Sequence, residues 1–219
     1  MRSGIYILEG LSPVSWLITI LACLPGGNEG FSRLEKFAHE SVLKRVRIKR
    51  DDDDVMSKLI SAARDPKVAN KIDMTFLTCD AMVIIIAGGD TVSITLSFLF
   101  YSLARYPHYV NHLRRELEHT DITDYRRLQA LPWINALINE TLRLYPPVPT
   151  APLRQTPPEG LRIGERFIPG NVVVSTPLWS LGRLESSYTR ADEFLPERWF
   201  PGSESIKDRR GFAPFLLRA

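Results

Sequence analysis

The sequence has 219 residues, of which 44% are hydrophobic and 24% are charged, and its formal net charge is +3. This length and composition are ordinary for a globular protein with one sizeable core. The basic residues are scattered and form no aromatic-interleaved face, so the charge does not indicate nucleic-acid binding. The two cysteines, Cys23 and Cys79, lack the spacing of a zinc site or a redox pair, and they favour a reducing compartment.

The first third of the chain is predicted to contain an apolar stretch followed by two helices. Residues 11–24 are apolar but shorter than the roughly 20 residues of a membrane span, and Glu9 disfavours a signal peptide because it interrupts the n-region. Apolar residues recur at helical spacing over residues 31–50, which predicts an amphipathic helix with a basic C-terminal end. The acidic run at 51–54 is interpreted as the N-cap of a short helix over 55–63.

Residues 71–105 form the dominant predicted element, a long helix without proline that Tyr106 and Pro107 end. Its centre, residues 81–103, is apolar enough to span a membrane by length alone. Asp90 lies in the middle, however, and a charge at a bilayer centre costs about 3 kcal/mol. We therefore expect a helix that covers most of residues 74–103 and is buried all round in a large soluble domain.

The rest of the chain is predicted to be two helices, a hairpin and loops. Charged residues 108–119 and residues 131–144, with Pro132 in the first turn, indicate helices. The proline-rich segment 145–149 ends the second of these. Alternation and turn residues over 160–175 predict a short β-hairpin, and the residues from 180 onwards read mostly as loop with one short helix. The predicted fold is therefore mainly α with a small β-hairpin.

Several catalytic classes find no support in the motifs. His108 and His112 could share a helix face, but no glutamate lies between them in a metalloprotease pattern. The sequence contains neither a phosphate-binding glycine-rich loop nor a Gly-x-Ser-x-Gly nucleophile elbow. Hydrolase and nucleotide-binding functions are accordingly disfavoured.

Glu140 and Arg143 are the first candidate polar pair, one helical turn apart in an apolar helix. Such a pair is ordinarily a surface ion pair worth a few tenths of a kcal/mol. Here the surrounding residues leave little polar surface, so a semi-buried pair needs a further partner. Arg198 is the natural third member, because one carboxylate can be shared between two planar guanidinium groups.

The sequence Ala-Gly-Gly-Asp-Thr at residues 87–91 is the second candidate. One interpretation is a tolerated polar kink in a buried helix. The other is functional: two glycines let a flat ligand approach the helix backbone, and Asp90 and Thr91 then face a buried cavity and relay protons to a bound group.

Three motifs, at residues 87–91, 140–143 (Glu-Thr-Leu-Arg) and 196–199 (Pro-Glu-Arg-Trp), together resemble the core of the cytochrome P450 family of haem-thiolate monooxygenases. The resemblance covers nearly the whole chain, from about residue 12. It implies a partial P450 fold, a single partial domain over residues 1–219, in which the long central helix crosses the distal face of the haem. The sequences of the hairpin and of residues 208–215 resemble those of fungal members that hydroxylate alkaloids such as tryptophan-derived diketopiperazines.

The resemblance also implies roles for individual residues. Asp90 and Thr91 would guide proton delivery, and Glu140, Arg143 and Arg198 would form the structural triad of the family. Positions that would bind the haem cofactor or line the substrate site are Ala87, Gly88 and Arg154 for haem, and Thr150, Ala151 and Pro152 for substrate.

Cofactors, partners and location follow from the same resemblance. It implies haem b, with electrons from NADPH through NADPH–cytochrome P450 reductase, and a small hydrophobic organic substrate such as an alkaloid or other secondary metabolite. The family resides at the cytosolic face of the endoplasmic reticulum membrane. The family's N-terminal half, with its anchor, does not appear in this sequence, which leaves a cytoplasmic location as the alternative.

The resemblance places the cysteine ligand of the iron beyond Ala219, so no residue of this chain is assigned as a metal ligand. Cys23 and Cys79 lie on or before the distal helix and cannot substitute, and without the thiolate the electron donation that favours O–O cleavage is absent. Two hypotheses follow: part of a P450 monooxygenase, or a non-catalytic truncated remnant that binds a partner or lipid or has no function.

Overall fold

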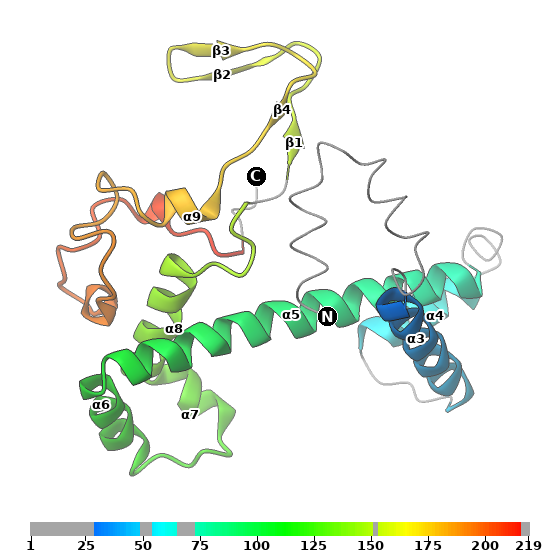
Figure 1. The fold of residues 1–219 in the computed structure, drawn as a ribbon, viewed down its shortest axis with the longest axis horizontal. Coiled ribbons are helices and arrows are strands. Elements are labelled where there is room, and N and C mark those ends of the chain that lie inside the picture. The colour runs from blue at the N-terminus through cyan, green and yellow to red at the C-terminus, as the bar shows by residue number, and fades with distance from the viewer. Residues whose placement is uncertain (1–28, 49–53, 65–72, 151–152, 216–219) are drawn as a thin grey trace. The chain divides into compact units, whose positions relative to one another are not determined.

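The computed structural model describes residues 29–48, 54–64, 73–150 and 153–215. Helices predominate among them, which confirms the predicted mainly α class (Figure 1). The helices are α3 (Glu29–Arg47), α4 (Val55–Arg64), α5 (Met74–Arg105), α6 (His108–Leu117), α7 (Tyr125–Ala130), α8 (Pro132–Leu144) and α9 (Leu178–Leu181). Two 3-10 helices follow, η2 (Pro196–Trp199) and η3 (Arg209–Gly211). The apolar stretch at 11–24 lies outside the described residues.

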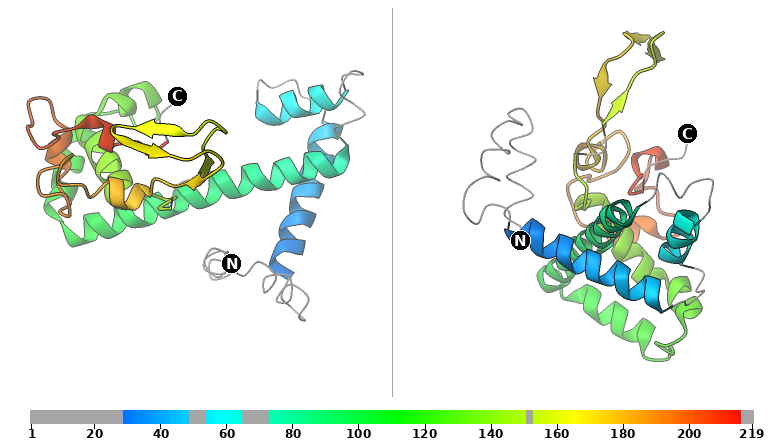
Figure 2. Two further views of the ribbon diagram at one scale, coloured as in Figure 1. Left: turned by 90° about the horizontal axis from the view of Figure 1, so that it is seen from above. Right: turned by 90° about the vertical axis from the view of Figure 1, so that its right-hand side faces the viewer.

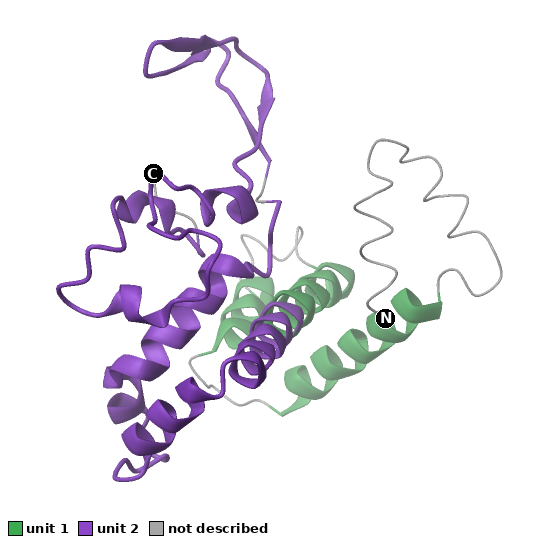
Figure 3. Cartoon of the chain, turned by 60° about the vertical axis from the view of Figure 1, so that its left-hand side comes forward, with its two compact units in different colours: residues 1–89 green, residues 90–219 purple. Residues whose placement is uncertain are grey.

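The chain divides into two compact units, residues 1–89 and 90–219, and the division falls within α5 (Figure 3). In the first unit, α3, α4 and the start of α5 pack around a small apolar core made of Ala38, Val42, Leu77, Ala81 and Met82. Asp54 begins α4, since its Oδ1 accepts a hydrogen bond from the Ser57 amide at 2.7 Å. The N-cap predicted for this helix is thus supplied by the last residue of the acidic run.

The core of the second unit lies between α6, α8 and the segment before η2. Its buried members are Tyr109, Leu137, Leu144 and Phe194. Tyr106 stacks on Phe194 with ring centroids 5.8 Å apart, and Tyr109 donates its hydroxyl to Glu197 at 3.0 Å. These contacts bring the irregular C-terminal segment against the helix that carries Glu140.

Two antiparallel ladders form the β structure, and both belong to one excursion of the chain (Figure 2). Strands β2 (Leu161–Ile163) and β3 (Arg166–Ile168) form the predicted hairpin, which turns at Gly164 with φ +60°. Strand β4 (Val173–Val174), expected to belong to that hairpin, pairs instead with β1 (Arg154–Gln155). Sequence alternation fixes neither partner nor register for strands this short, so the pairing across the excursion escaped prediction.

The central helix α5 differs from its prediction in burial. It is long and apolar enough to cross a membrane by length and composition, yet none of the residues in its most apolar 18-residue window is buried. Val83 is 63% exposed and Phe100 is 66% exposed. The expectation of a helix buried all round is therefore wrong for the described residues, which pack against α5 near its two ends, through Leu77 and Ala81 and through Leu99 and Leu103.

The N-terminus of α8 is capped from another helix. Its own N-cap residue, Leu131, offers no side-chain acceptor. The carboxylate of Glu116 on α6 instead accepts the amides of Trp133 at 2.9 Å and Ile134 at 3.2 Å. A carboxylate at this end also complements the helix dipole, so Glu116 fixes where the triad-bearing helix begins.

We expect Glu116→Ala to lower the free energy of unfolding by about 1–2 kcal/mol, because two amides and the dipole of α8 lose their partner. The exposed Glu118, the C-cap of α6, provides the control, and Glu118→Ala should stay within about 0.5 kcal/mol of wild type. Urea denaturation of both variants measures the difference. Equal losses would contradict a capping role for Glu116.

Candidate functional site

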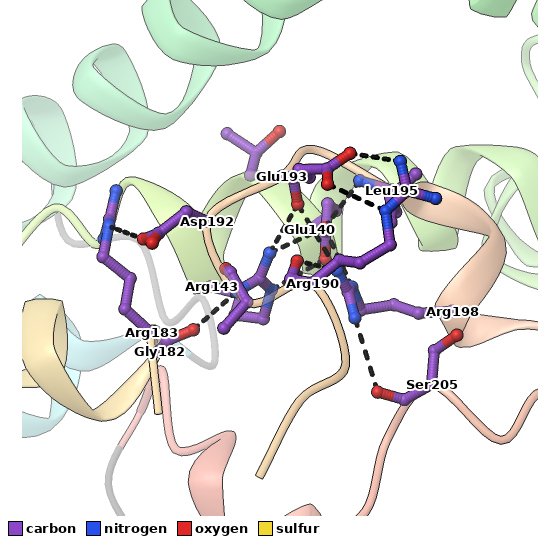
Figure 4. A network of polar contacts seen from close by, with 12 residues as sticks. Glu140, Arg143, Gly182, Arg183, Arg190, Asp192, Glu193, Leu195, Arg198 and Ser205 are labelled. Atoms are coloured by element: carbon purple, nitrogen blue, oxygen red, sulfur yellow. Dashed lines mark hydrogen bonds and ion pairs between the residues drawn. The ribbon is translucent and has the colours of Figure 1, made fainter. Parts of the chain in front are cut away.

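The site is built around the carboxylate of Glu140 on α8, which is fully buried (Figure 4). Its Oε1 accepts from Arg143 Nη2 at 2.8 Å, from the Leu195 amide at 2.8 Å and from Arg198 Nε at 3.0 Å. Its Oε2 accepts from Arg143 Nε at 2.9 Å and from Trp199 Nε1 at 3.0 Å. Both oxygens are therefore saturated with donors, which is the condition for holding a charge away from water.

The two guanidinium groups extend the cluster into backbone that has little regular structure. Arg143 donates to three carbonyls, those of Gly182 at 2.5 Å, Ala191 at 2.6 Å and Glu193 at 2.9 Å. Arg198 donates to the carbonyls of Thr189 at 3.0 Å, Arg190 at 3.1 Å, Glu193 at 3.3 Å and Ser205 at 3.4 Å. Each arginine thus serves as a rigid multi-donor that collects loop carbonyls from residues 182–205.

The close approach of this loop to α8 needs glycine at one point. A Cβ on Gly182 would lie 2.2 Å from the Arg143 carbonyl oxygen. Arg190 adopts a left-handed conformation with φ 53°, which is uncommon for a side chain of this size. In this conformation its carbonyl accepts a hydrogen bond from Arg198 Nη2, and its side chain donates to the nearby Glu193 carboxylate. The local backbone cost is tolerated because the surrounding contacts determine the conformation.

The buried charges leave an excess of one positive charge, since two arginines share one carboxylate. The aromatic ring of Tyr188 offsets part of that excess positive charge. The Arg143 guanidinium carbon lies 4.9 Å from the ring centroid and that of Arg198 lies 5.7 Å away, both in cation–π range. Burial raises the pKa of Tyr188 to about 12, so the phenol stays neutral at physiological pH.

The motif on α5 is placed differently. Gly88, Gly89 and Asp90 are exposed and Thr91 is half-buried. An added Cβ at either glycine would meet nothing within 4 Å, so the helix backbone is open there. The carbonyls of Asp90 and Thr91 accept from Ser93 Oγ at 3.0 Å and Thr95 Oγ1 at 2.9 Å, as in a regular helix.

The remaining predicted positions also lie apart from the charge cluster. Arg154 is exposed on β1 and donates to the neighbouring Leu153 carbonyl at 3.3 Å. Thr150 is exposed, and its carbonyl accepts from Ser175 Oγ at 2.9 Å. Ala151 and Pro152 lie outside the described residues. The structure thus brings together Glu140, Arg143 and Arg198, while the proposed haem and substrate positions share no contact with them among the described residues.

Three contributors to the site were not predicted from sequence: Tyr188, Arg190 and Trp199. Trp199 belongs to the matched Pro-Glu-Arg-Trp motif, and its indole N–H is a donor that seeks a partner when buried. That signal could have identified it. Tyr188 and Arg190 carry no local pattern that indicates a contact with α8.

Comparison with known proteins identifies the class of this fold and site. A family model described as cytochrome P450 matches residues 29–215. The chain is 38% identical over 210 residues to tryprostatin B 6-hydroxylase of Aspergillus fumigatus, covering 93% of this chain and 37% of that protein. It is 34% identical over 203 residues to the cytochrome P450 monooxygenase eupD of a Phoma species, covering 86% and 71%. The chain belongs to the cytochrome P450 family.

A solved structure supports the fold. Cyanobacterial CYP120A1 with retinoic acid bound superposes with a TM-score of 0.74 at 21% identity, covering 89% of this chain and 45% of that one. The partial P450 fold expected from the sequence is thereby confirmed. This chain spans less than half the length of that protein and of the tryprostatin hydroxylase.

Two of the positions expected at a haem site, Gly88 and Arg154, are each open within their own unit. The open backbone beside Gly88 and Gly89 leaves room for a flat group, which a Cβ would restrict. Arg154 is exposed and free to bind a carboxylate, apart from one local contact. Among the described residues the one cysteine is Cys79, exposed on α5. The described residues therefore include no cysteine that could ligate a haem iron from the side opposite α5.

We expect Glu140→Gln to lower the free energy of unfolding by about 3–5 kcal/mol, because two buried guanidinium groups lose their counter-charge. Glu193→Gln tests the exposed Arg190–Glu193 pair as a control and should cost no more than about 1 kcal/mol. Urea unfolding followed by circular dichroism measures both. A Glu140→Gln variant as stable as wild type would refute the structural role of the carboxylate.

Tyr188 allows ring and hydroxyl to be separated. Its Oη is buried without a hydrogen-bond partner in the described part of the chain, so Tyr188→Phe should change the free energy of unfolding by less than about 1 kcal/mol or raise it. Tyr188→Leu removes the ring face that both guanidinium groups approach and should cost about 2 kcal/mol or more. The two variants are compared by urea denaturation, and similar losses would show that the hydroxyl, and not the ring, is what matters.

Proposed function

We propose that this chain is part of a haem-thiolate monooxygenase that inserts one atom of dioxygen into a small organic substrate, with electrons derived from NADPH through a reductase. The observation that carries the proposal is the buried cluster of Glu140, Arg143 and Arg198, present together with the family's motifs in their usual order. The same cluster holds the loop that leads towards the expected ligand segment. A reductase partner and the cytosolic face of the endoplasmic reticulum membrane belong to the same proposal.

The haem would supply oxygen activation, and the chain's own residues would provide binding and protons. Ala87 and Gly88 leave the side of α5 open to the porphyrin. Arg154 would bind one of its propionates, as a planar guanidinium suits a carboxylate. Asp90 and the Thr91 hydroxyl would hold and pass the proton that the reaction consumes.

The substrate class is proposed from the relatives. The name of one relative states that it hydroxylates tryprostatin B at position 6. We propose a small secondary metabolite, such as an alkaloid, contacted by Thr150, Ala151 and Pro152. The alternative is a non-catalytic remnant that binds a partner.

Sequencing the full transcript separates the two functions. A codon series for Gly-x-Arg-x-Cys-x-Gly after Ala219 would support the monooxygenase. The longer protein, purified with haem, reduced and exposed to carbon monoxide, should then give the Soret band of a thiolate-bound haem. If the transcript ends at Ala219, or if the longer protein lacks that band, the monooxygenase proposal fails.

The relay is tested in the longer protein with Thr91→Ala. We expect product formation to fall by about 100-fold, with hydrogen peroxide formed in its place, because a positioned proton donor is lost. Ser97→Ala, on the same helix with its hydroxyl bonded to the Ser93 carbonyl at 2.6 Å, is the matched control and should keep wild-type coupling. The measurement is the amount of product and of peroxide formed per NADPH consumed. Unchanged product per NADPH in Thr91→Ala would refute the relay and indicate that Asp90 and Thr91 only form a polar kink in the helix.

A further inference from the structure

Trp199 connects two parts of the second unit, the buried charge cluster and the segment after η3. It closes η2 and is half-buried. Its Nε1 donates to Glu140 Oε2 at 3.0 Å. Its ring lies against Phe212, with centroids 4.4 Å apart and planes tilted by 57°. One side chain thus contacts both the buried carboxylate and the segment that follows η3.

The hydrogen bond gives Trp199 a specific place in the cluster. Oε1 of Glu140 has three donors, whereas Oε2 has Arg143 Nε and the indole N–H. A carboxylate oxygen accepts two hydrogen bonds readily. The indole therefore completes Oε2 and, with the bidentate Arg143, helps to hold the orientation of the carboxylate. Phenylalanine at this position would keep a ring and lose that donor.

The segment from Lys207 to Phe212 is held from a second side as well. The Lys207 amide donates to the Ser187 carbonyl at 2.8 Å. A Cβ on Gly211 would lie 2.8 Å from the Ser187 Oγ and 3.2 Å from Tyr188 Cε2, so the backbone approaches closely there. Phe212 follows directly, and its ring contacts that of Trp199.

Beyond Phe212 the chain lines a small cleft with α8 and α9. Its walls include Leu142, Pro146 and Leu178 on one side and Phe212, Ala213 and Pro214 on the other. Residues 212–214 therefore leave the cluster alongside α8, the helix that carries Glu140. We propose that Trp199 is a positioning residue that couples the orientation of the Glu140 carboxylate to the course of residues 212–214.

This inference rests on the proposed function in one respect, because the family places its ligand loop after these residues. In that setting Trp199 would determine where the loop begins relative to α8. The coupling itself is a property of the 219-residue chain and requires neither haem nor a ligand loop.

Hydrogen exchange by NMR on the 219-residue chain tests the coupling. The chain has four tryptophans, and the indole N–H signal that disappears in Trp199→Phe assigns Trp199. We expect that proton to be protected from exchange in wild type. In Trp199→Phe, the amides of Gly211 and Phe212, which donate to the Asp208 and Arg209 carbonyls, should exchange at least about tenfold faster, the effect expected for one lost hydrogen bond to a charged group.

Coupling is reciprocal, so the reverse experiment is decisive. Phe212→Leu removes the ring contact and leaves the indole donor in place, and it should raise exchange of the Trp199 indole proton by about tenfold. Trp179→Phe is the control, since Trp179 is 47% exposed and contacts Arg183 outside this pathway; it should leave both sets of protons unchanged.

The inference is overturned if the Trp199 indole proton exchanges as fast as a free one, or if Phe212→Leu leaves its exchange unchanged. If Trp199→Phe unfolds the whole chain, these two measurements still decide, because neither uses that variant once the signal is assigned by elimination of Trp16, Trp133 and Trp179. Failure of the carbon monoxide test in the longer protein would count against the proposed function and leave these results unaffected.

Discussion

The structure of the second unit depends on one buried negative charge, the carboxylate of Glu140. The segment from residue 182 to 212 has little regular structure, so its carbonyls need donors from elsewhere. Arg143 and Arg198 supply those donors, and each must be buried to reach them. Two buried guanidinium groups in turn require a counter-charge, which Glu140 provides with every acceptor position used. The order of dependence therefore runs from carboxylate to arginines to loop.

Contacts among the helices set the position of the Glu140 carboxylate independently of the loop. Glu116 on α6 determines where α8 begins, and the spacing along α8 then places Glu140 and Arg143 on one face. Tyr109 on α6 holds Glu197 of η2, the neighbour of Arg198. A short-range scaffold thus positions both halves of a long-range cluster. The result explains how four residues of 3-10 helix can be held accurately without a sheet or a long helix of their own.

Sequence reasoning succeeded where the signal was local. Helical spacing and proline positions located α3, α4, α5, α6 and α8 to within a few residues. It missed α7, although Asp124 is a strong N-cap signal whose carboxylate accepts from the Arg126 and Arg127 amides. Grouping Glu140, Arg143 and Arg198 came from the chemistry of sharing a carboxylate and from family resemblance. Tyr188 and Arg190 could not be found this way, because their roles depend on loop geometry that no periodicity records. The burial of α5 was overestimated. Its apolar composition indicates that the helix can be buried, but the described residues do not supply enough packing partners to bury it.

The cluster and the α5 motif carry different kinds of information about function. The residues of the cluster are required for folding, since removal of the carboxylate leaves buried charges unpaired. The motif has no such explanation. Two glycines within a helix each lower its stability by about 1 kcal/mol relative to alanine, and no packing in the described residues compensates at Gly88 or Gly89. Asp90 is exposed on the same helix and makes no ion pair in the described part of the chain. The fold of these residues alone therefore does not require this sequence, and we propose a ligand and a proton path beside α5 as its reason, in addition to the cluster that carries the proposed function.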